Sequence, residues 1–153
     1  HTPGNEPARV LLKRDVEPVS DTITSAAAAL IKIEREQNGD GRRSLLALMA
    51  DLQSAFTSSQ SLLLRFVQDA NAVDENALRQ QLTLSKARIT DIAAQPELLQ
   101  TDQAELIALI QGELSAYELL AQQVVEARIS AQWNVAQFRL ANEAVPPAKR
   151  PNC

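Results

Sequence analysis

The sequence is poor in aromatic residues, which make up 3% of its 153 residues. Its apolar fraction of 45% therefore comes mainly from Leu, Ala, Ile and Val. Leu and Ala favour helices, whereas strands are enriched in aromatic and β-branched residues. This composition favours helices packed on helices and gives little support for a sheet.

Histidine and cysteine are almost absent, with His1 and Cys153 at the two ends of the chain. A histidine-dependent catalytic triad and a histidine-rich metal site are therefore excluded from the folded body. An intrachain disulfide is excluded too, so Cys153 is interpreted as a free thiol, an intermolecular bridge or a labelling handle. No Glu-x-x-His pattern or phosphate-binding glycine loop occurs. We expect no enzymatic activity, no metal and no cofactor.

Long charged or apolar runs are missing as well. The formal charge of −4 is spread over interspersed acids and bases, without the basic stripe that holds a nucleic-acid backbone. The longest apolar run, residues 26–31, is far shorter than the roughly twenty residues of a membrane span. We expect neither nucleic-acid binding nor a transmembrane helix.

The strongest pattern in the chain is a helical one that runs through residues 101–144 without a proline. Apolar residues recur there at alternating steps of four and three, as on one face of a helix. Asp102 and Glu105 fit an acidic capping box at its start, and Gly112 is the expected place for a bend or a break. The stripe consists of Ile107, Ile110, Leu114, Tyr117, Ala121, Val124, Arg128, Ala131, Val135 and Phe138.

Three shorter helices are predicted before it, with Asp15, Ser44 and Asp74 as their expected caps. Residues 38–41, Asn-Gly-Asp-Gly, predict a turn between the first two helices, and Pro96 ends the third. Short connections favour antiparallel neighbours. The sequence therefore predicts an all-α, up-down antiparallel bundle of four to five helices with a long C-terminal helix.

Both ends of the chain are expected to lie outside that bundle. We divide the sequence into a disordered leader (residues 1–14), a helical bundle (residues 15–144) and a flexible, proline-containing tail (residues 145–153). The first residue is not methionine, so we expect that an N-terminal segment such as a secretory signal has been removed. Lys13 and Arg14 are interpreted either as a processing site of a secreted precursor or as an ordinary solvated charge pair.

Residues 13–129 resemble the fungal secreted family of hydrophobic surface-binding protein A, which includes cell-wall mannoproteins that bind lipids. The resemblance lies in residue-class patterns: Lys13-Arg14-Asp15-Val16 before a Val/Ile-rich helix, residues 52–67, residues 74–92 and residues 106–129. The turn at residues 38–41 and the continuation of the last helix beyond Ile129 depart from the family pattern. The resemblance implies a secreted, non-enzymatic protein, extracellular or in the cell wall, that binds apolar surfaces or a fatty acyl chain between its helices.

Binding of an acyl chain between the helices requires an apolar tunnel. Small residues at core positions can leave such a tunnel open, or they can simply allow the helices to pack closely. Each methylene group buried there contributes about 0.8 kcal/mol. Tyr117 is expected to bind the carboxylate head through its hydroxyl group. The expected ligand-binding residues are Leu52, Phe56, Leu63, Phe66, Ile89, Leu114 and Tyr117.

Trp133 lies beside the apolar stripe of the last helix and is interpreted either as packed on a neighbouring segment or as an exposed surface anchor. Two other functions remain open. One is the ligand-sensing, four-helix ectodomain of a bacterial receptor, which the polar residues 146–153 disfavour because no second membrane span follows. The other is a secreted effector that binds a host protein through the surface around Trp133.

Overall fold

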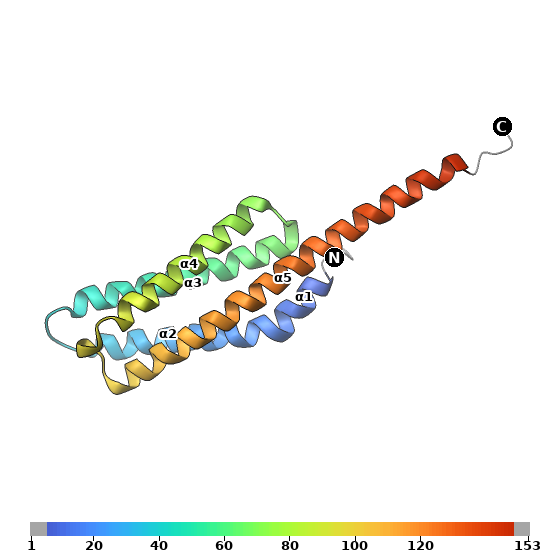
Figure 1. Ribbon diagram of the computed structural model, residues 1–153. Helices are drawn as coiled ribbons and strands as arrows, with labels where there is room; N and C mark the ends of the chain where they lie inside the picture. Colours follow the sequence, from blue (N-terminus) through green and yellow to red (C-terminus); the bar gives the residue numbers. More distant parts are fainter. Residues whose placement is uncertain (1–5, 149–153) are drawn as a thin grey trace.

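The computed structural model describes residues 6–148, leaving aside the side chains of Val135 and of residues 143–148. Every secondary-structure element in this range is helical (Figure 1). The predicted all-α bundle with a long C-terminal helix is confirmed. The elements are α1 (Glu6–Leu11), a π-helical segment η2 (Leu12–Val16), α2 (Glu17–Arg35), α3 (Arg42–Asp69), α4 (Ala72–Ala93), a 3₁₀ turn η3 (Pro96–Leu98) and α5 (Thr101–Ala148).

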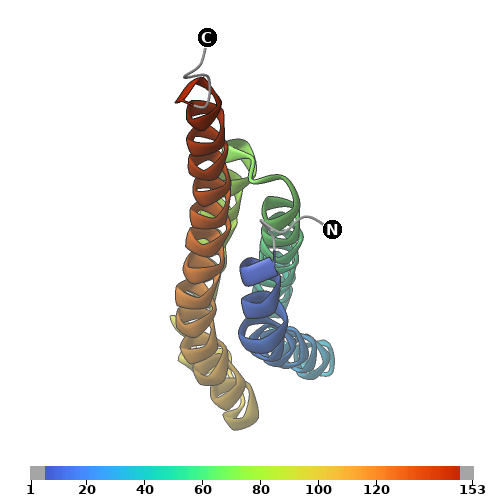
Figure 2. The same ribbon diagram turned by 90° about the vertical axis from the view of Figure 1, so that its right-hand side faces the viewer.

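Four helical rods make up the bundle, because α1, η2 and α2 follow one another without a break and Gly112 does not divide α5. Each rod packs on the next in sequence, and α5 returns to pack on α2. The views in Figures 1 and 2 agree that α3 and α4 form a hairpin beside the pair of α2 and α5. The C-terminal part of α5 projects beyond the other helices in both views.

The turn predicted at residues 38–41 connects α2 to α3, as expected. Gly39 and Gly41 have φ angles of 125° and 82°, a region that glycine adopts without steric cost. Space is also limited at Gly41, where an added Cβ would lie 3.1 Å from Cδ1 of Leu98. A side chain at Gly41 would therefore cause both backbone strain and a close contact with η3.

The helix caps differ from those expected at Ser44 and Asp74. Gly41 precedes α3 and makes no side-chain cap, because the helix already begins at Arg42. Asn71 caps α4 by accepting a hydrogen bond from the backbone N–H of Val73 at 2.8 Å. The buried carboxylate of Asp74 instead forms an ion pair with Arg65 on α3 at 3.1 Å.

The expected capping box of Asp102 and Glu105 is also displaced. The side-chain oxygen of Gln103 accepts a hydrogen bond from the backbone N–H of Gln100 at 2.9 Å, which is the returning half of a capping box. The amide group of Gln103 donates to the buried carboxylate of Glu34 on α2 at 2.8 Å, and Arg42 on α3 donates to the same oxygen at 3.0 Å. This network joins three helices at one end of the bundle.

The disordered leader expected for residues 1–14 is corrected from Glu6 onward, since α1 and η2 are helical. Ala8 is fully buried and α1 packs on α5, so burial of a small apolar side chain orders this segment. Asp15 lies within the continuous helix, where its carboxylate pairs with Arg14 at 2.8 Å and caps nothing. The flexible tail expected from residue 145 is corrected for residues 145–148, which belong to α5, while residues 1–5 and 149–153 lie outside the described range.

Candidate functional site

The seven expected ligand-binding residues come from α3, α4 and α5, and all belong to the core cluster of the whole bundle. None of them is more than 3% exposed. Leu63 and Tyr117 also border a groove of about 160 Å³, which lies between α3 and the segment formed by η2 and the start of α2. Their positions show a shared structural role in the core, while their role in binding stays a prediction.

Tyr117 is the polar member of this cluster. Its ring packs edge-to-face on Phe56 with centroids 4.8 Å apart. Burial raises the pKa of Tyr117 to about 12, and a side-chain hydrogen bond with Ser59 acts in the opposite direction. The hydroxyl of Ser59 in turn donates to the backbone oxygen of Phe56 at 2.6 Å. The phenol group therefore has a protein partner already, which a carboxylate head would have to replace.

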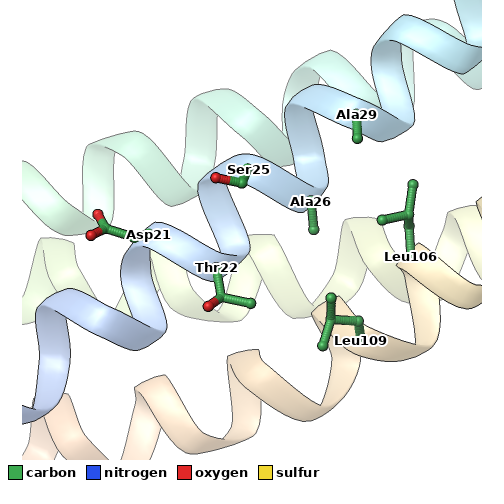
Figure 3. Close-up of a pocket in the computed structure, with 7 residues that line it drawn as sticks. All are labelled: Asp21, Thr22, Ser25, Ala26, Ala29, Leu106 and Leu109. Atoms are coloured by element: carbon green, nitrogen blue, oxygen red, sulfur yellow. The ribbon is translucent and has the colours of Figure 1, made fainter.

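A shallow groove of about 430 Å³ runs between α2 and α5 (Figure 3). Alanine side chains on α2, at Ala26 and Ala29, face Leu106 and Leu109 on α5 in this view. Small side chains on α2 leave space between the helices, and Asp21 lies at one end of the groove. Thr22 and Ser25 also line the groove, which is open to solvent.

A second apolar groove of about 380 Å³ lies between α4 and α5. Leu78 and Leu82 on α4 line it together with Val125 on α5, and Leu119 borders it with 68% of its surface exposed. The groove is rimmed by Glu75 and Arg79, which form an ion pair with an N–O distance of 2.6 Å.

The predicted apolar stripe of α5 is buried from Ile107 to Val124, as expected, and Arg128 marks its end. The guanidinium group of Arg128 donates from Nε to the backbone oxygen of Val67 at 2.6 Å and from Nη2 to that of Gln68 at 3.3 Å. These carbonyl groups belong to the last turn of α3, which has no partners for them within the helix. A cation at this end of a helix is also favoured by the helix dipole.

The α5 extension, residues 129–148, follows Arg128 and carries most of the exposed large apolar side chains of the helix. Ile129, Trp133, Phe138 and Leu140 are 46%, 61%, 67% and 62% exposed. The expectation that Phe138 belongs to the core is therefore wrong, because no other helix of the bundle extends alongside this part of α5 (Figure 1). For Trp133, the exposed alternative is the one that the structure supports.

Two apolar faces run along the extension. One continues the core stripe through Ala131 and Phe138. The other contains Ile129, Trp133, Ala136 and Leu140 at steps of four, three and four, and is named here the Trp133 face. The sequence analysis identified Trp133 alone on this face. The spacing of Ile129, Ala136 and Leu140 relative to Trp133, in steps of three and four residues, would have identified these three residues as part of the same face.

Charges are sparse on the extension, which carries Arg139 and Glu143 as its ionisable side chains. Among the described residues, no group of three or more His, Cys, Asp or Glu side chains is placed to hold a metal ion. No helix in the described part of the chain has the length and hydropathy needed to cross a membrane.

Comparisons of the chain with protein-family models, with curated proteins and with solved structures found no match in any of the three. Arguments about function therefore depend on the grooves and on the α5 extension themselves.

Proposed function

We propose that this protein is a non-enzymatic helical protein that binds apolar surfaces, and that the α5 extension is the element that makes contact. The observation that carries the proposal is the exposure of the Trp133 face beyond the packed bundle. Large apolar side chains gathered on one exposed surface mark interaction sites, whereas single ones are ordinary. An extracellular or cell-wall location, which the resemblance of residues 13–129 would imply, is part of the proposal.

The energetics favour adsorption along this face. Burying an exposed Ile or Leu side chain contributes about 1.5–3 kcal/mol. Ile129 and Leu140 both lie on the Trp133 face and are about half to two-thirds exposed, so part of that contribution is available to each. Trp133 adds an amphipathic ring of the kind enriched at apolar–water interfaces.

The extension carries few charges, and this determines which kind of apolar surface we expect it to bind. Amphipathic helices that bind anionic lipids carry many Lys and Arg residues on their polar face. The extension has Arg139 and Glu143, whose charges oppose each other. We therefore expect binding to uncharged apolar surfaces, with little dependence on salt concentration.

A second candidate is binding of a fatty acyl chain, which the groove between α2 and α5 favours. Ala26 and Ala29 leave an apolar channel beside Leu106 and Leu109 (Figure 3). The groove is open, so a bound chain would stay partly in contact with water and would gain less than one in an enclosed tunnel. We rank this function below surface binding for that reason.

Flotation with uncharged phosphatidylcholine vesicles tests the first proposal. We expect the chain to float with the vesicles, the emission of Trp133 to shift to shorter wavelength, and both effects to persist at high salt. The variant Trp133→Ser/Leu140→Ser should lose flotation. Leu119→Ser is the matched control, because Leu119 is exposed on the same helix but lies beside the bundle.

Several results would contradict the proposal. Absence of flotation by the folded wild-type chain would exclude binding to lipid surfaces, as would equal flotation of the double variant and the Leu119 control. Saturable binding of a fluorescent fatty acid that is lost in a folded Ala29→Phe variant would instead support the acyl-chain candidate. Binding of neither probe would leave a protein partner, including a host or cell-wall protein, as the favoured class.

A further inference from the structure

The core stripe of α5 follows a heptad pattern, in which every position lies four or three residues after the previous one. Its buried part has polar residues at both ends, Gln103 and Arg128, and apolar residues between them. The same steps continue into the α5 extension without an interruption. The continuation places Ala131, Val135, Phe138, Asn142 and Val145 in the stripe.

The bundle buries this stripe as far as Arg128, and the next stripe residue, Ala131, is half-buried. Arg128 contacts the last turn of α3, and beyond it Phe138 is 67% exposed and Asn142 is exposed as well. Among the described residues, no other helix lies alongside the projecting end of α5, as Figure 1 shows. The stripe that packs α5 into its own bundle thus continues as an uncovered surface.

The residue types in the continuation favour a particular partner. Counting Ile107 as position a, Val135 and Asn142 occupy a positions, and Ala131 and Phe138 occupy d positions. A single Asn at an a position fixes register and oligomeric state in coiled coils, and the β-branched Val135 at the preceding a position is compatible with a two-stranded parallel pair. An adsorption face would gain nothing from the polar Asn142 in the middle of its stripe.

The flanking positions are compatible with a second copy of the chain. Positions e and g hold Gln132, Asn134, Arg139 and Ala141. In a parallel pair, Asn134 of one copy lies opposite Arg139 of the other, so no like charges meet. Charge repulsion therefore does not oppose the pairing.

Helix stability provides an independent argument. The extension is about 30 Å long at ~1.5 Å per residue and continues the packed part of α5, but beyond the bundle it has only its intrinsic helix propensity to stabilise it. Its charged residues, Arg139 and Glu143, are spaced i,i+4 in the sequence in the less favourable order, with the base before the acid. Packing against another helix is the usual source of the missing stability.

We propose that two copies of this chain associate through their α5 extensions as a short parallel coiled coil centred on Phe138 and Asn142. The Trp133 face lies outside the pairing surface, since Trp133 and Val135 point about 160° apart around a helix with 3.6 residues per turn. Pairing and surface binding therefore use different side chains of the same extension. Either proposal can be refuted by experiment while the other stands.

Sedimentation equilibrium of the full chain under reducing conditions tests the pairing. We expect a concentration-dependent change from the 16.7 kDa monomer to twice that mass. Phe138→Glu should raise the dimer Kd by more than about tenfold, because it places two like charges in the pairing stripe. Leu140→Glu is the matched control and should keep the dimer while losing flotation with vesicles.

Orientation is tested by disulfide formation in the Asn142→Cys/Cys153→Ser variant. A parallel pair brings the two introduced cysteines to the same level of the coiled coil, so mild oxidation should link them. A wild-type chain that stays monomeric up to millimolar concentration would overturn the proposal. So would a dimer that survives Phe138→Glu but dissociates in Leu140→Glu, or an Asn142→Cys dimer that does not cross-link.

Discussion

Arg128 separates the packed part of α5 from its exposed part. It occupies an apolar stripe, where an arginine is unexpected from the pattern alone, and its guanidinium group is buried against carbonyl oxygens of Val67 and Gln68. A buried cation is tolerated there because these acceptors lie at the C-terminal end of α3.

We expect Arg128→Ala to lower the free energy of unfolding by about 1–3 kcal/mol, since it leaves acceptors of α3 unsatisfied. Urea denaturation followed by circular dichroism measures the change. Arg139→Ala, on the exposed extension, is the control and should stay within about 0.5 kcal/mol of the wild type. If the two variants had the same free energy of unfolding, the contact of Arg128 with α3 would not contribute to stability.

Tyr117 gives the core a dependence on pH. Its pKa in the folded protein is about 12, whereas an unfolded tyrosine titrates near 10. The stability due to this difference is complete below pH 10 and is lost as the pH rises through 12, because the unfolded chain releases the proton first.

At pH 11 this loss should amount to about 1.4 kcal/mol relative to pH 8, since one pH unit above the unfolded pKa corresponds to 1.36 kcal/mol. Urea denaturation at both values, in the wild type and in Tyr117→Phe, isolates the contribution of the phenol. The chain has one tyrosine, so its ultraviolet difference absorbance reports Tyr117 directly. The same pH dependence in Tyr117→Phe would assign the effect to other groups.

Among the elements, α5 has two parts with different surroundings. Its buried residues up to Arg128 pack in the bundle with α1, α2, α3 and α4, whereas the large apolar side chains beyond Arg128 are exposed. Residues 1–14 were expected to be disordered because they contain proline and glycine. In the structure, α1 is helical and packs on α5.

Removing residues 132–153 should leave the bundle almost as stable as before, within about 1 kcal/mol, because the buried residues of α5 end at Arg128. Thermal unfolding measured by circular dichroism checks this expectation. The truncated chain should also be monomeric and should not float with vesicles. A large loss of stability would mean that the extension packs on the bundle in solution.

At the scale of the whole molecule, the protein is a packed four-rod bundle with an uncovered helical arm. The single tryptophan lies on the arm and the single tyrosine lies in the core. The two residues therefore report on different parts of the molecule.

We expect cooperative thermal unfolding in the far-ultraviolet circular dichroism signal, with little change in the Trp133 emission wavelength across the same transition. Trp133 is 61% exposed before unfolding, so its surroundings are aqueous in both states. Parallel recordings on one sample test this, and Tyr117→Trp/Trp133→Phe is the informative control because its tryptophan lies in the core. A large red shift of wild-type emission at the bundle transition would contradict the expected position of Trp133.

Sequence patterns located the helices and their buried faces well, since the periodic stripe from Ile107 to Val124 and the glycine turn at residues 38–41 both occur as predicted. The caps were predicted less well. Ser44, Asp74 and the pair Asp102 and Glu105 have suitable chemistry, yet Gly41, Asn71 and Gln103 hold the positions next to the helix ends. Capping depends on where a helix ends, and neighbouring helices influence that end.

The sequence by itself determined the fold class, because helical periodicity and the scarcity of aromatic residues are local properties. Only the tertiary structure decided where the core stripe of α5 is covered. Phe138 continues the pattern of Tyr117 in the sequence, but one is 67% exposed and the other 1% exposed. The physical reason is that burial needs a partner helix, and the bundle packs on α5 only as far as Arg128.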